Sequence, residues 1–387
     1  MNKKIKMGLV GGGPGSFIGP VHFRAAIMDG HIELVCGAFD SDPVQSKASA
    51  EIYNISPKRA YGTWEEMFEK ENSLPENEKM DMVAVTTPNH LHFPISMKAL
   101  ENGFHVVCEK PVTVSLDEAK RLAAMVDDTG LLFALTHTYT GYPMVKEAKH
   151  LVSRNQLGTI RKIVVEYPQG WLSTPLEKTG NQQAEWRSKP EYNGPGGCLG
   201  DIGVHAENLA EYITGLQIDE LCADINSFVP GRALDDDTSV LLRFEGGARG
   251  VLWATQIAAG EENNLTIRVY GEKGGLEWRQ HDPNTLLLKM LDQPVQILRA
   301  GKNYSNLSEI ARWNLRIPGG HPEGYIEAFA NIYKNMAHAI QQRKENLPVD
   351  PAYLDFPTVH DGVRGMRFIE KVIESAAGSE KWIKFQG

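Results

Sequence analysis

The chain has only four cysteines among its 387 residues, and they lie far apart in the sequence. No C-x-x-C pair is present, so their spacing indicates neither a zinc site nor a disulfide framework, and we expect no metal. Reduced thiols in a cytoplasmic protein are the default for such a chain. Long apolar runs are also missing, since no stretch approaches the roughly 18 residues that cross a bilayer. The lysines near the N-terminus precede a short apolar stretch that enters a run of glycines, which predicts a first strand and not a signal peptide.

An excess of positive charge is missing as well, because 40 Lys and Arg residues face 49 Asp and Glu residues, giving a net charge of −9. This balance argues against nucleic acid and against an anionic membrane surface as partners, and it favours a small-molecule ligand. Hydrophobic residues make up 42% and charged residues 23%, as in ordinary globular proteins. A chain of this length suits two domains.

The chain opens with a strand that runs directly into a glycine-rich turn. Residues 5–10 read as a buried strand, residues 21–28 as a helix, and the turn between them is Gly11-Gly12-Gly13-Pro14-Gly15-Ser16-Phe17-Ile18-Gly19. This arrangement presents backbone N–H groups and a positive helix end to a pyrophosphate. Gly11 and Gly13 match the first two glycines of the G-x-G-x-x-G pattern, but the third comes only at Gly19, so the turn is enlarged. A flexible surface turn is the alternative interpretation.

An acidic residue, Asp40, ends the second predicted strand, over residues 32–39. A dinucleotide fold places there the group that hydrogen bonds to the adenosine ribose. Ser41 follows instead of an arginine, so nothing obvious awaits a 2′-phosphate and the sequence favours NAD over NADP. The alternatives are that Asp40 is only a turn residue, or that Asp42 takes this role.

Strands and helices alternate through the rest of the first third. Further strands are predicted over 82–86, 105–108 and 131–136, and helices over 44–51, 64–69, 90–102, 117–127 and 143–154. This alternation predicts a parallel doubly wound sheet in a first domain, residues 1–140, with ligands at the carboxyl ends of its strands. Thr86-Thr87-Pro88-Asn89 follows one strand and Glu109-Lys110-Pro111 the next, so we expect both segments in the cleft.

From about residue 160 the pattern changes to strand-like runs, many of them alternating with period two. These runs cover 160–167, 221–229, 238–244, 250–257, 265–270, 286–290 and 295–298, and helices follow over 322–343 and 359–376. They predict a second domain, residues 141–387, of α+β class with a large, mainly antiparallel sheet. Segment 171–199 is a long irregular insertion of the kind that often lines a site. The fold class expected for the whole chain is therefore α/β.

The strongest candidate for chemistry lies in the segment 196–205, Gly-Gly-Cys-Leu-Gly-Asp-Ile-Gly-Val-His. A helix is predicted over 201–214, which places Asp201 and His205 on one face because they stand at positions i and i+4. The glycines before this helix let backbone or ligand approach closely. The alternative is an ordinary helix with an acid near its N-terminal dipole and a histidine in the core.

Taken together, these features resemble the Gfo/Idh/MocA oxidoreductase family. The features are the glycine-rich turn, the acid after the second strand, Thr-Pro-Asn followed by His92, Glu109-Lys110-Pro111, and Gly-Asp-x-Gly-x-His. The resemblance implies a Rossmann domain, a C-terminal domain with an open sheet, NAD as cofactor, and homodimers or homotetramers built on that sheet. The enlarged turn, the Trp186-Arg187 segment and residues 355–362 are similar to the branch of levoglucosan dehydrogenase and the glycoside 3-dehydrogenases.

The resemblance also assigns residues by position. Lys110, Asp201 and His205 would be the catalytic set. The dinucleotide would be lined by Gly11, Gly13, Phe17, Ile18, Asp40, Thr87, Pro88, Asn89, His92, Glu109 and Lys110. Sugar contacts would come from Tyr139, Tyr142, Gln169, Trp186, Arg187 and His321, besides Asp201 and His205. The alternative for Trp186 is a core residue, and for Arg187 a solvated surface cation.

The activity that the resemblance implies is oxidation of a secondary hydroxyl, at C3 by the branch, of a sugar, glycoside or anhydrosugar. An imidazole suits proton removal near neutral pH because its ordinary pKa is about 6.5, so His205 is the expected base. Lys110 would donate to the same oxygen and Asp201 would orient, or Lys110 would itself accept the proton if burial lowers its pKa. Three alternatives stay open: a glycosidase that oxidises transiently and eliminates, an inositol or nucleotide-sugar dehydrogenase, and a non-catalytic NAD-binding sensor.

Overall fold

The computed structural model describes residues 4–386. Contacts between Cα atoms divide the chain into two compact units. Unit 1 holds the described part of Met1–Thr113 together with Asp117–Thr138 and Tyr325–Val363, and unit 2 holds Val114–Leu116, Tyr139–Gly324 and the described part of Arg364–Gly387. Each of these packing units is made of several separate segments of the chain, whereas we expected one boundary, between residues 140 and 141. That boundary stays a prediction about functional domains.

Unit 1 is built on a five-stranded sheet in the order β2-β1-β3-β4-β5, with every neighbouring pair parallel. The strands are β1 (Ile5–Val10), β2 (Ile32–Ala38), β3 (Met82–Val85), β4 (His105–Cys108) and β5 (Phe133–Leu135). Each falls within a strand expected from the sequence. The prediction of a parallel doubly wound sheet is therefore confirmed.

Helices pack on both faces of this sheet because successive strand residues point to opposite sides. The helices are α1 (Ile18–Met28), α2 (Pro43–Ala48), α3 (Trp64–Asn72), α4 (His92–Glu101), α5 (Leu116–Thr129) and α11 (Tyr325–Lys344). Met7 and Leu9 belong to the apolar cluster that α1 and α11 complete. Gly8 faces the other side, where a Cβ would lie 3.7 Å from the Met67 methyl on α3. A helix from late in the chain thus covers the N-terminal sheet.

Unit 2 is built on a nine-stranded sheet in the order β13-β12-β11-β10-β6-β9-β8-β7-β14. The strands are β6 (Ile160–Pro168), β7 (Ile218–Asn226), β8 (Asp237–Phe244), β9 (Arg249–Thr255), β10 (Thr266–Gly271), β11 (Gly274–Arg279), β12 (Thr285–Met290), β13 (Gln296–Arg299) and β14 (Ile383–Lys384). Only β6 and β9 pair in parallel, so the expected mainly antiparallel sheet is confirmed. Strands β11 and β14 were not anticipated.

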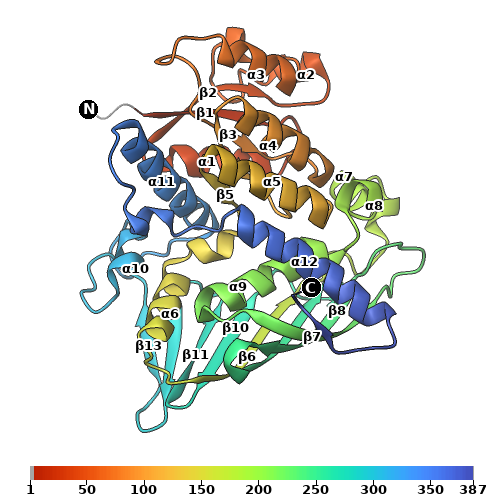
Figure 1. Cartoon of the computed structure of the whole chain (residues 1–387), viewed down its shortest axis with the longest axis vertical. Coiled ribbons are helices and arrows are strands. Elements are labelled where there is room, and N and C mark those ends of the chain that lie inside the picture. Colours follow the sequence, from red (N-terminus) through yellow and green to blue (C-terminus); the bar gives the residue numbers. More distant parts are fainter. Residues whose placement is uncertain (1–3, 387) are drawn as a thin grey trace. The chain divides into compact units, whose positions relative to one another are not determined.

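Two helices, α6 (Pro143–Ser153) and α9 (Val204–Thr214), pack against each other and against one face of this sheet (Figure 1). Helix α9 contacts β6, β9 and β10, whereas α6 contacts β11 and β12. The shorter α10 (Glu309–Trp313) packs on α6, and α12 (Val359–Ala377) begins among the residues of unit 1 and ends among those of unit 2.

The insertion over 171–199 is more regular than the sequence indicated. It contains two short helices, α7 (Gln182–Arg187) and α8 (Pro190–Asn193), and a single 3₁₀ turn at Leu176–Lys178. Helix α7 starts where the Asn181 side chain accepts a hydrogen bond from the amide of Ala184. This cap fixes where α7 begins, and Trp186 and Arg187 are the last two residues of that helix.

All four cysteines are free thiols. Across residues 4–386, the helices lack the combination of length and apolar character that a bilayer crossing requires.

Candidate functional site

The glycine-rich turn of unit 1 is pressed against the ends of two strands. Gly11 has a φ of +89°, and a Cβ there would lie 2.9 Å from the carbonyl oxygen of Thr86, after β3. A Cβ at Gly13 would lie 2.6 Å from a carboxylate oxygen of Asp40, after β2. Only glycine fits these two positions. The turn therefore packs tightly against the strand ends and is not a flexible surface loop.

In the first turn of α1, the Gly19 amide donates a 3.3 Å hydrogen bond to the Ser16 hydroxyl, and Pro20 has no N–H. No side chain caps this helix at Phe17, and no acidic residue lies in its first turn. Phe17 is 65% exposed and Ile18 begins the helix. In the loop after β3, the Thr87 hydroxyl is buried and has no hydrogen-bond partner within residues 4–386. A positive helix end without an acidic residue in its first turn, together with an unsatisfied hydroxyl, fits a pyrophosphate-containing ligand such as NAD.

The two acidic candidates after β2 have different surroundings. Asp42 is the N-cap of α2, and its carboxylate accepts a 2.9 Å hydrogen bond from the Val44 amide. Asp40 accepts from the Asp42 amide through one oxygen, while its other oxygen lies beside Gly13. Asp40 is therefore the better placed of the two for a ribose contact.

Glu109 is anchored inside unit 1. His22 Nε2 lies 2.9 Å from one carboxylate oxygen, and its Nδ1 lies 2.6 Å from the Tyr333 hydroxyl on α11. Thr136 donates a 2.6 Å hydrogen bond to the same Glu109 oxygen, and the Lys110 amide donates to the other one. Burial alone would raise the pKa of Glu109, but the hydrogen bond from His22 and nearby positive charge hold it below its ordinary value. These contacts fix the backbone from which the Lys110 side chain leaves.

His92 joins two loops of the same edge. It is fully buried, with one ring nitrogen 2.9 Å from the carbonyl oxygen of Thr87 and the other 2.7 Å from that of Pro111. Burial lowers the pKa of His92, against the two carbonyls that raise it. Pro88 and Asn89 stand between these loops, and Asn89 is itself buried. The geometry indicates that His92 holds the loops together, and its contact with the cofactor stays a prediction.

In unit 2, Asp201 and His205 lie on different kinds of helical turn. Asp201 belongs to a π-helical segment, Leu199–Gly203, and His205 to α9, which starts at Val204. The expectation of one regular helix over 201–214 was therefore wrong at its start. The physical reason is Asp235, whose carboxylate accepts hydrogen bonds from the amides of Gly197 and Leu199 and so fixes the entering turn. Such π-helical turns occur often at functional sites.

A continuous chain of hydrogen bonds runs from Asp201 across the ends of the central strands. We call this set the polar chain, and its members are Asp201, Gln256, Gln169, Asn263, Tyr167 and Tyr139. Gln256 donates a 2.8 Å hydrogen bond to Asp201 and a 3.2 Å hydrogen bond to Gln169. Gln169 donates at 2.6 Å to Asn263, which also accepts at 2.8 Å from Tyr167. Gln169, Gln256 and Asn263 come from the ends of β6, β9 and β10 and Tyr167 from β6 itself, whereas Tyr139 and Asp201 come from helical turns.

Aromatic rings pack around His205, which is 8% exposed. The Tyr139 ring meets it edge-on with centroids 4.9 Å apart, and the Tyr167 ring lies at 6.3 Å. Burial raises the pKa of Tyr139, so its hydroxyl stays protonated near neutral pH. Tyr142 is buried between Tyr139 and Trp278, as a core residue of unit 2.

Arg187 approaches Asp201 from the insertion. Its Nε lies 3.4 Å from the Asp201 carboxylate, and its guanidinium stacks over the Trp186 ring at 4.2 Å. Asp201, Arg187 and Gln256 together line a pocket within unit 2. The alternative of a solvated surface cation does not describe Arg187. His321 is exposed in the loop after α10 and lies outside the polar chain.

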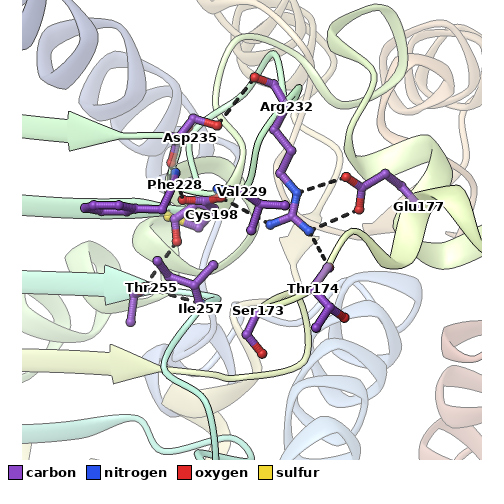
Figure 2. A network of polar contacts seen from close by, with 12 residues as sticks. Ser173, Thr174, Glu177, Cys198, Phe228, Val229, Arg232, Asp235, Thr255 and Ile257 are labelled. Atoms are coloured by element: carbon purple, nitrogen blue, oxygen red, sulfur yellow. Dashed lines mark hydrogen bonds and ion pairs between the residues drawn. The ribbon is translucent and has the colours of Figure 1, made fainter.

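A second arginine, Arg232, ties the insertion to the loop before β8 (Figure 2). Its guanidinium binds both carboxylate oxygens of Glu177, at 3.0 and 3.2 Å, and the carbonyl oxygen of Thr174 at 2.8 Å. Asp236 accepts a 3.2 Å hydrogen bond from Nη1 of Arg232. The sequence analysis did not single out His22, Asp235, Arg232, Gln256 or Asn263. Gln256 and Asn263 could have been noticed as polar residues at strand ends, whereas the other three carried no signal.

Comparison with known proteins agrees with this geometry. Residues 5–137 match the model of an oxidoreductase family with an NAD-binding Rossmann fold, so the N-terminal part is that of an NAD-binding oxidoreductase. Residues 145–277 match the model of the GFO/IDH/MocA C-terminal domain. The chain belongs to the Gfo/Idh/MocA family of oxidoreductases, and the predictions of family, cofactor and enzyme class are confirmed.

Three relatives illustrate the similarity. An uncharacterized oxidoreductase of Bacillus subtilis, YfiI, is 31% identical over 100% of this chain and 98% of its own. The solved structure of an inositol dehydrogenase homologue with NAD⁺ from Azotobacter vinelandii is 35% identical, covers 99% of this chain and 97% of its own, and has a TM-score of 0.93. Levoglucosan dehydrogenase of Pseudarthrobacter phenanthrenivorans is 27% identical over 71% of this chain and 73% of its own.

Proposed function

We propose that this protein oxidises a secondary hydroxyl of a sugar, glycoside or anhydrosugar, at C3, by hydride transfer to NAD. The observation that carries the proposal is the polar chain of unit 2, which runs from Asp201 to Tyr139, whose ring meets the His205 imidazole edge-on. A set of amide and hydroxyl groups is what a polyhydroxylated ligand requires, because each can donate or accept.

The cofactor would be held by residues of unit 1. The start of α1, with Phe17 and Ile18, is assigned to the pyrophosphate. Gly11 and Gly13 line the turn without offering their amides, which donate to the carbonyl oxygens of Ala38 and Phe39 at 2.9 and 2.7 Å. Asp40 is assigned to the ribose, and the loop of Thr87, Pro88 and Asn89 to the nicotinamide side. When bound, NAD accepts a hydride from the carbon that bears the hydroxyl. Glu109 and His92 serve this site indirectly by fixing the loops.

Removal of the hydroxyl proton is assigned to side chains of the protein. His205 takes the hydroxyl proton, because an imidazole is a suitable base near neutral pH. Lys110 donates to the same oxygen and stabilises its developing negative charge. Asp201, held by Gln256 and paired with Arg187, orients the substrate hydroxyls. Trp186 offers an apolar ring to the sugar face, and Tyr139 and Gln169 belong to the hydroxyl-binding array.

Oxidation of a cyclitol is the second candidate. A solved structure of the Azotobacter vinelandii homologue is described as a complex with NADH and myo-inositol, and that chain is 35% identical to this one with a TM-score of 0.90. Inositol presents the same ring of secondary hydroxyls as a sugar, so the polar chain would serve both substrates.

The test is the appearance of reduced nicotinamide absorbance when NAD is offered with glucosides, levoglucosan and myo-inositol. We expect NADH with at least one of them. Replacing His205 with Ala should lower kcat by about 10²–10⁴-fold with a smaller change in KM, as for loss of a general base. His281→Ala, an exposed histidine of unit 2, is the matched control. Release of an aglycone or free sugar without NADH would instead indicate the glycosidase that oxidises and eliminates, and neither signal would favour a sensor.

A further inference from the structure

A buried tyrosine from elsewhere in unit 1 is hydrogen bonded to the backbone of the glycine-rich turn. Tyr53 lies in the turn that follows α2 and is 3% exposed, and its hydroxyl donates to the carbonyl oxygen of Gly12. We propose that Tyr53 is a positioning residue for NAD, because this hydrogen bond holds the turn and the start of α1 in the shape that receives the pyrophosphate. The proposal rests on the function proposed above, in which the start of α1 is assigned to the pyrophosphate.

The Tyr53 ring is fixed by two other aromatic rings. It stacks on Phe39, the residue directly after β2, with centroids 4.6 Å apart and an angle of 14° between the planes. Phe23 of α1 meets it edge-on at 5.2 Å. Burial raises the pKa of Tyr53 to about 12, although the charge of Arg24 lowers it. The hydroxyl therefore stays protonated near neutral pH and acts as the donor to the turn.

The hydrogen bond from Tyr53 fixes one particular peptide group. The carbonyl of Gly12 and the N–H of Gly13 belong to the same planar peptide and point in opposite directions. The Gly13 amide donates to the carbonyl oxygen of Phe39 at 2.7 Å, so both sides of this plane are held. Because glycine flanks the plane on each side, the local backbone would otherwise let it rotate. The Tyr53 hydroxyl thus supplies an orientation that the glycines leave open.

Gly12 transmits its position to α1 by direct contact. A Cβ at Gly19, the second residue of α1, would lie 2.2 Å from the Cα of Gly12, so the two backbones touch. On its other side, a Cβ at Gly12 would lie 2.6 Å from the Tyr53 hydroxyl. A shift of Gly12 is therefore passed to the start of α1, where Phe17 and Ile18 lie. The binding of a pyrophosphate depends on the position of that helix end.

The direct test is Tyr53→Phe, which removes the hydroxyl and keeps the stacked ring. Competition against NADH, followed by its fluorescence, gives the Kd of ADP-ribose, which carries the pyrophosphate, and of adenosine, which does not. We expect the Kd of ADP-ribose to rise about 3–10-fold, as for one lost hydrogen bond, and that of adenosine to change by less than about 2-fold. An equal change for both ligands, or none for either, would overturn the proposal.

Tyr61→Phe is the matched control. Tyr61 is another buried tyrosine of unit 1, and its hydroxyl donates a 2.8 Å hydrogen bond to Glu71, away from the turn. This variant should lower the thermal stability as Tyr53→Phe does, but it should leave the ratio of the two Kd values at the wild-type level. A ratio that changes equally in both variants would report a general loss of stability and would overturn the proposal.

Hydrogen exchange measures the turn itself. We expect residues 11–19 to exchange faster in Tyr53→Phe than in the wild type and in Tyr61→Phe, and unchanged exchange in Tyr53→Phe would contradict the positioning role. Equal Kd values for ADP-ribose and adenosine in the wild type would refute the pyrophosphate assignment itself, whereas a wild-type preference that Tyr53→Phe keeps would refute only the role of Tyr53. Both experiments measure binding or exchange, so a failure to oxidise any sugar would count against the proposed function and leave this inference intact.

Discussion

At the scale of single residues, the clearest division of labour lies between Asp40 and Asp42. The first lies against Gly13, whereas the second caps α2. We predict that Asp40→Ala raises KM for NAD at least about 10-fold and narrows the preference for NAD over NADP, because a ribose hydrogen-bond partner is lost. Initial rates with each cofactor measure this effect.

Asp42→Ala is the matched control for that prediction. It should cost about 1 kcal/mol of stability through loss of the helix cap and leave KM for NAD near the wild-type value. The reverse outcome, with the cofactor effect in Asp42→Ala, would transfer the ribose role to Asp42.

The half-buried His105 of unit 1 makes the stability of the protein depend on pH. Burial, with the charge of Arg343, lowers the pKa of His105 to about 4, and its Nδ1 accepts a hydrogen bond from the Leu132 amide. Because the folded pKa lies below the ordinary value near 6.5, the unfolded chain binds a proton first as the pH falls. His105 therefore costs about 2 kcal/mol of unfolding free energy between pH 7.5 and pH 5.

Urea unfolding of the wild type and of His105→Gln at the two pH values measures this cost. We expect the variant to lose about 2 kcal/mol less than the wild type on acidification. His360→Gln, a change at an exposed histidine of the same unit, should follow the wild type. Equal pH dependence in His105→Gln and the wild type would show that His105 does not titrate in this way.

At the scale of elements, the turn that enters the π-helical segment depends on glycine at one position. A Cβ at Gly197 would lie 2.0 Å from the Asp235 carbonyl oxygen, whereas a Cβ at Gly200 would meet only the Ile369 side chain at 3.8 Å. We predict that Gly197→Ala lowers stability by about 2 kcal/mol or more and lowers kcat/KM, because the turn that presents Asp201 must move. Gly200→Ala should change both by little. Thermal unfolding and initial rates give the comparison, and similar effects of the two changes would contradict it.

The same turn shows where sequence reasoning stops. The residues of the turn and of α9 were identified from glycines and a 3.6-residue stripe, but the π geometry is imposed by Asp235, more than 30 residues downstream. Strand β11 was missed because it begins Gly274-Gly275, which reads as a turn, and its pairing with β10 and β12 decides its conformation. Short local patterns hold no information about such partners.

At the scale of the whole chain, the sequence indicated both sheets but not which helices complete them. The helix now seen as α11 was anticipated, yet its apolar face gives no sign that it packs on the N-terminal sheet. The polar chain was likewise only partly foreseen. Tyr139, Gln169 and Asp201 were candidates, whereas Gln256 and Asn263 join them only because β6, β9 and β10 lie side by side.

The large sheet also supports a proposal about assembly. Strand register places Leu241, Val164 and Ile297 on one face, opposite the face that packs on α6 and α9. Leu241 is 48% and Ile297 is 64% exposed. We expect a homodimer or homotetramer formed through this face, since exposed apolar residues such as Leu241 and Ile297 favour association.

Light scattering after size-exclusion chromatography tests the assembly. The double variant Leu241→Lys/Ile297→Lys should have a lower mass than the wild type. Leu291→Lys, a change at an 82% exposed leucine of a loop, should not. A monomeric wild type, or an unchanged mass in the double variant, would refute this interface.

The most direct measurement of the proposed function uses a glucoside or anhydrosugar deuterated at C3, incubated with the protein and NAD. We predict that the deuterium appears in the nicotinamide ring of the reduced cofactor by mass spectrometry, together with a 3-keto product, and that His205→Ala slows this transfer. A product formed without deuterium in the cofactor, or NADH formed with the label retained on the sugar, would contradict oxidation at C3.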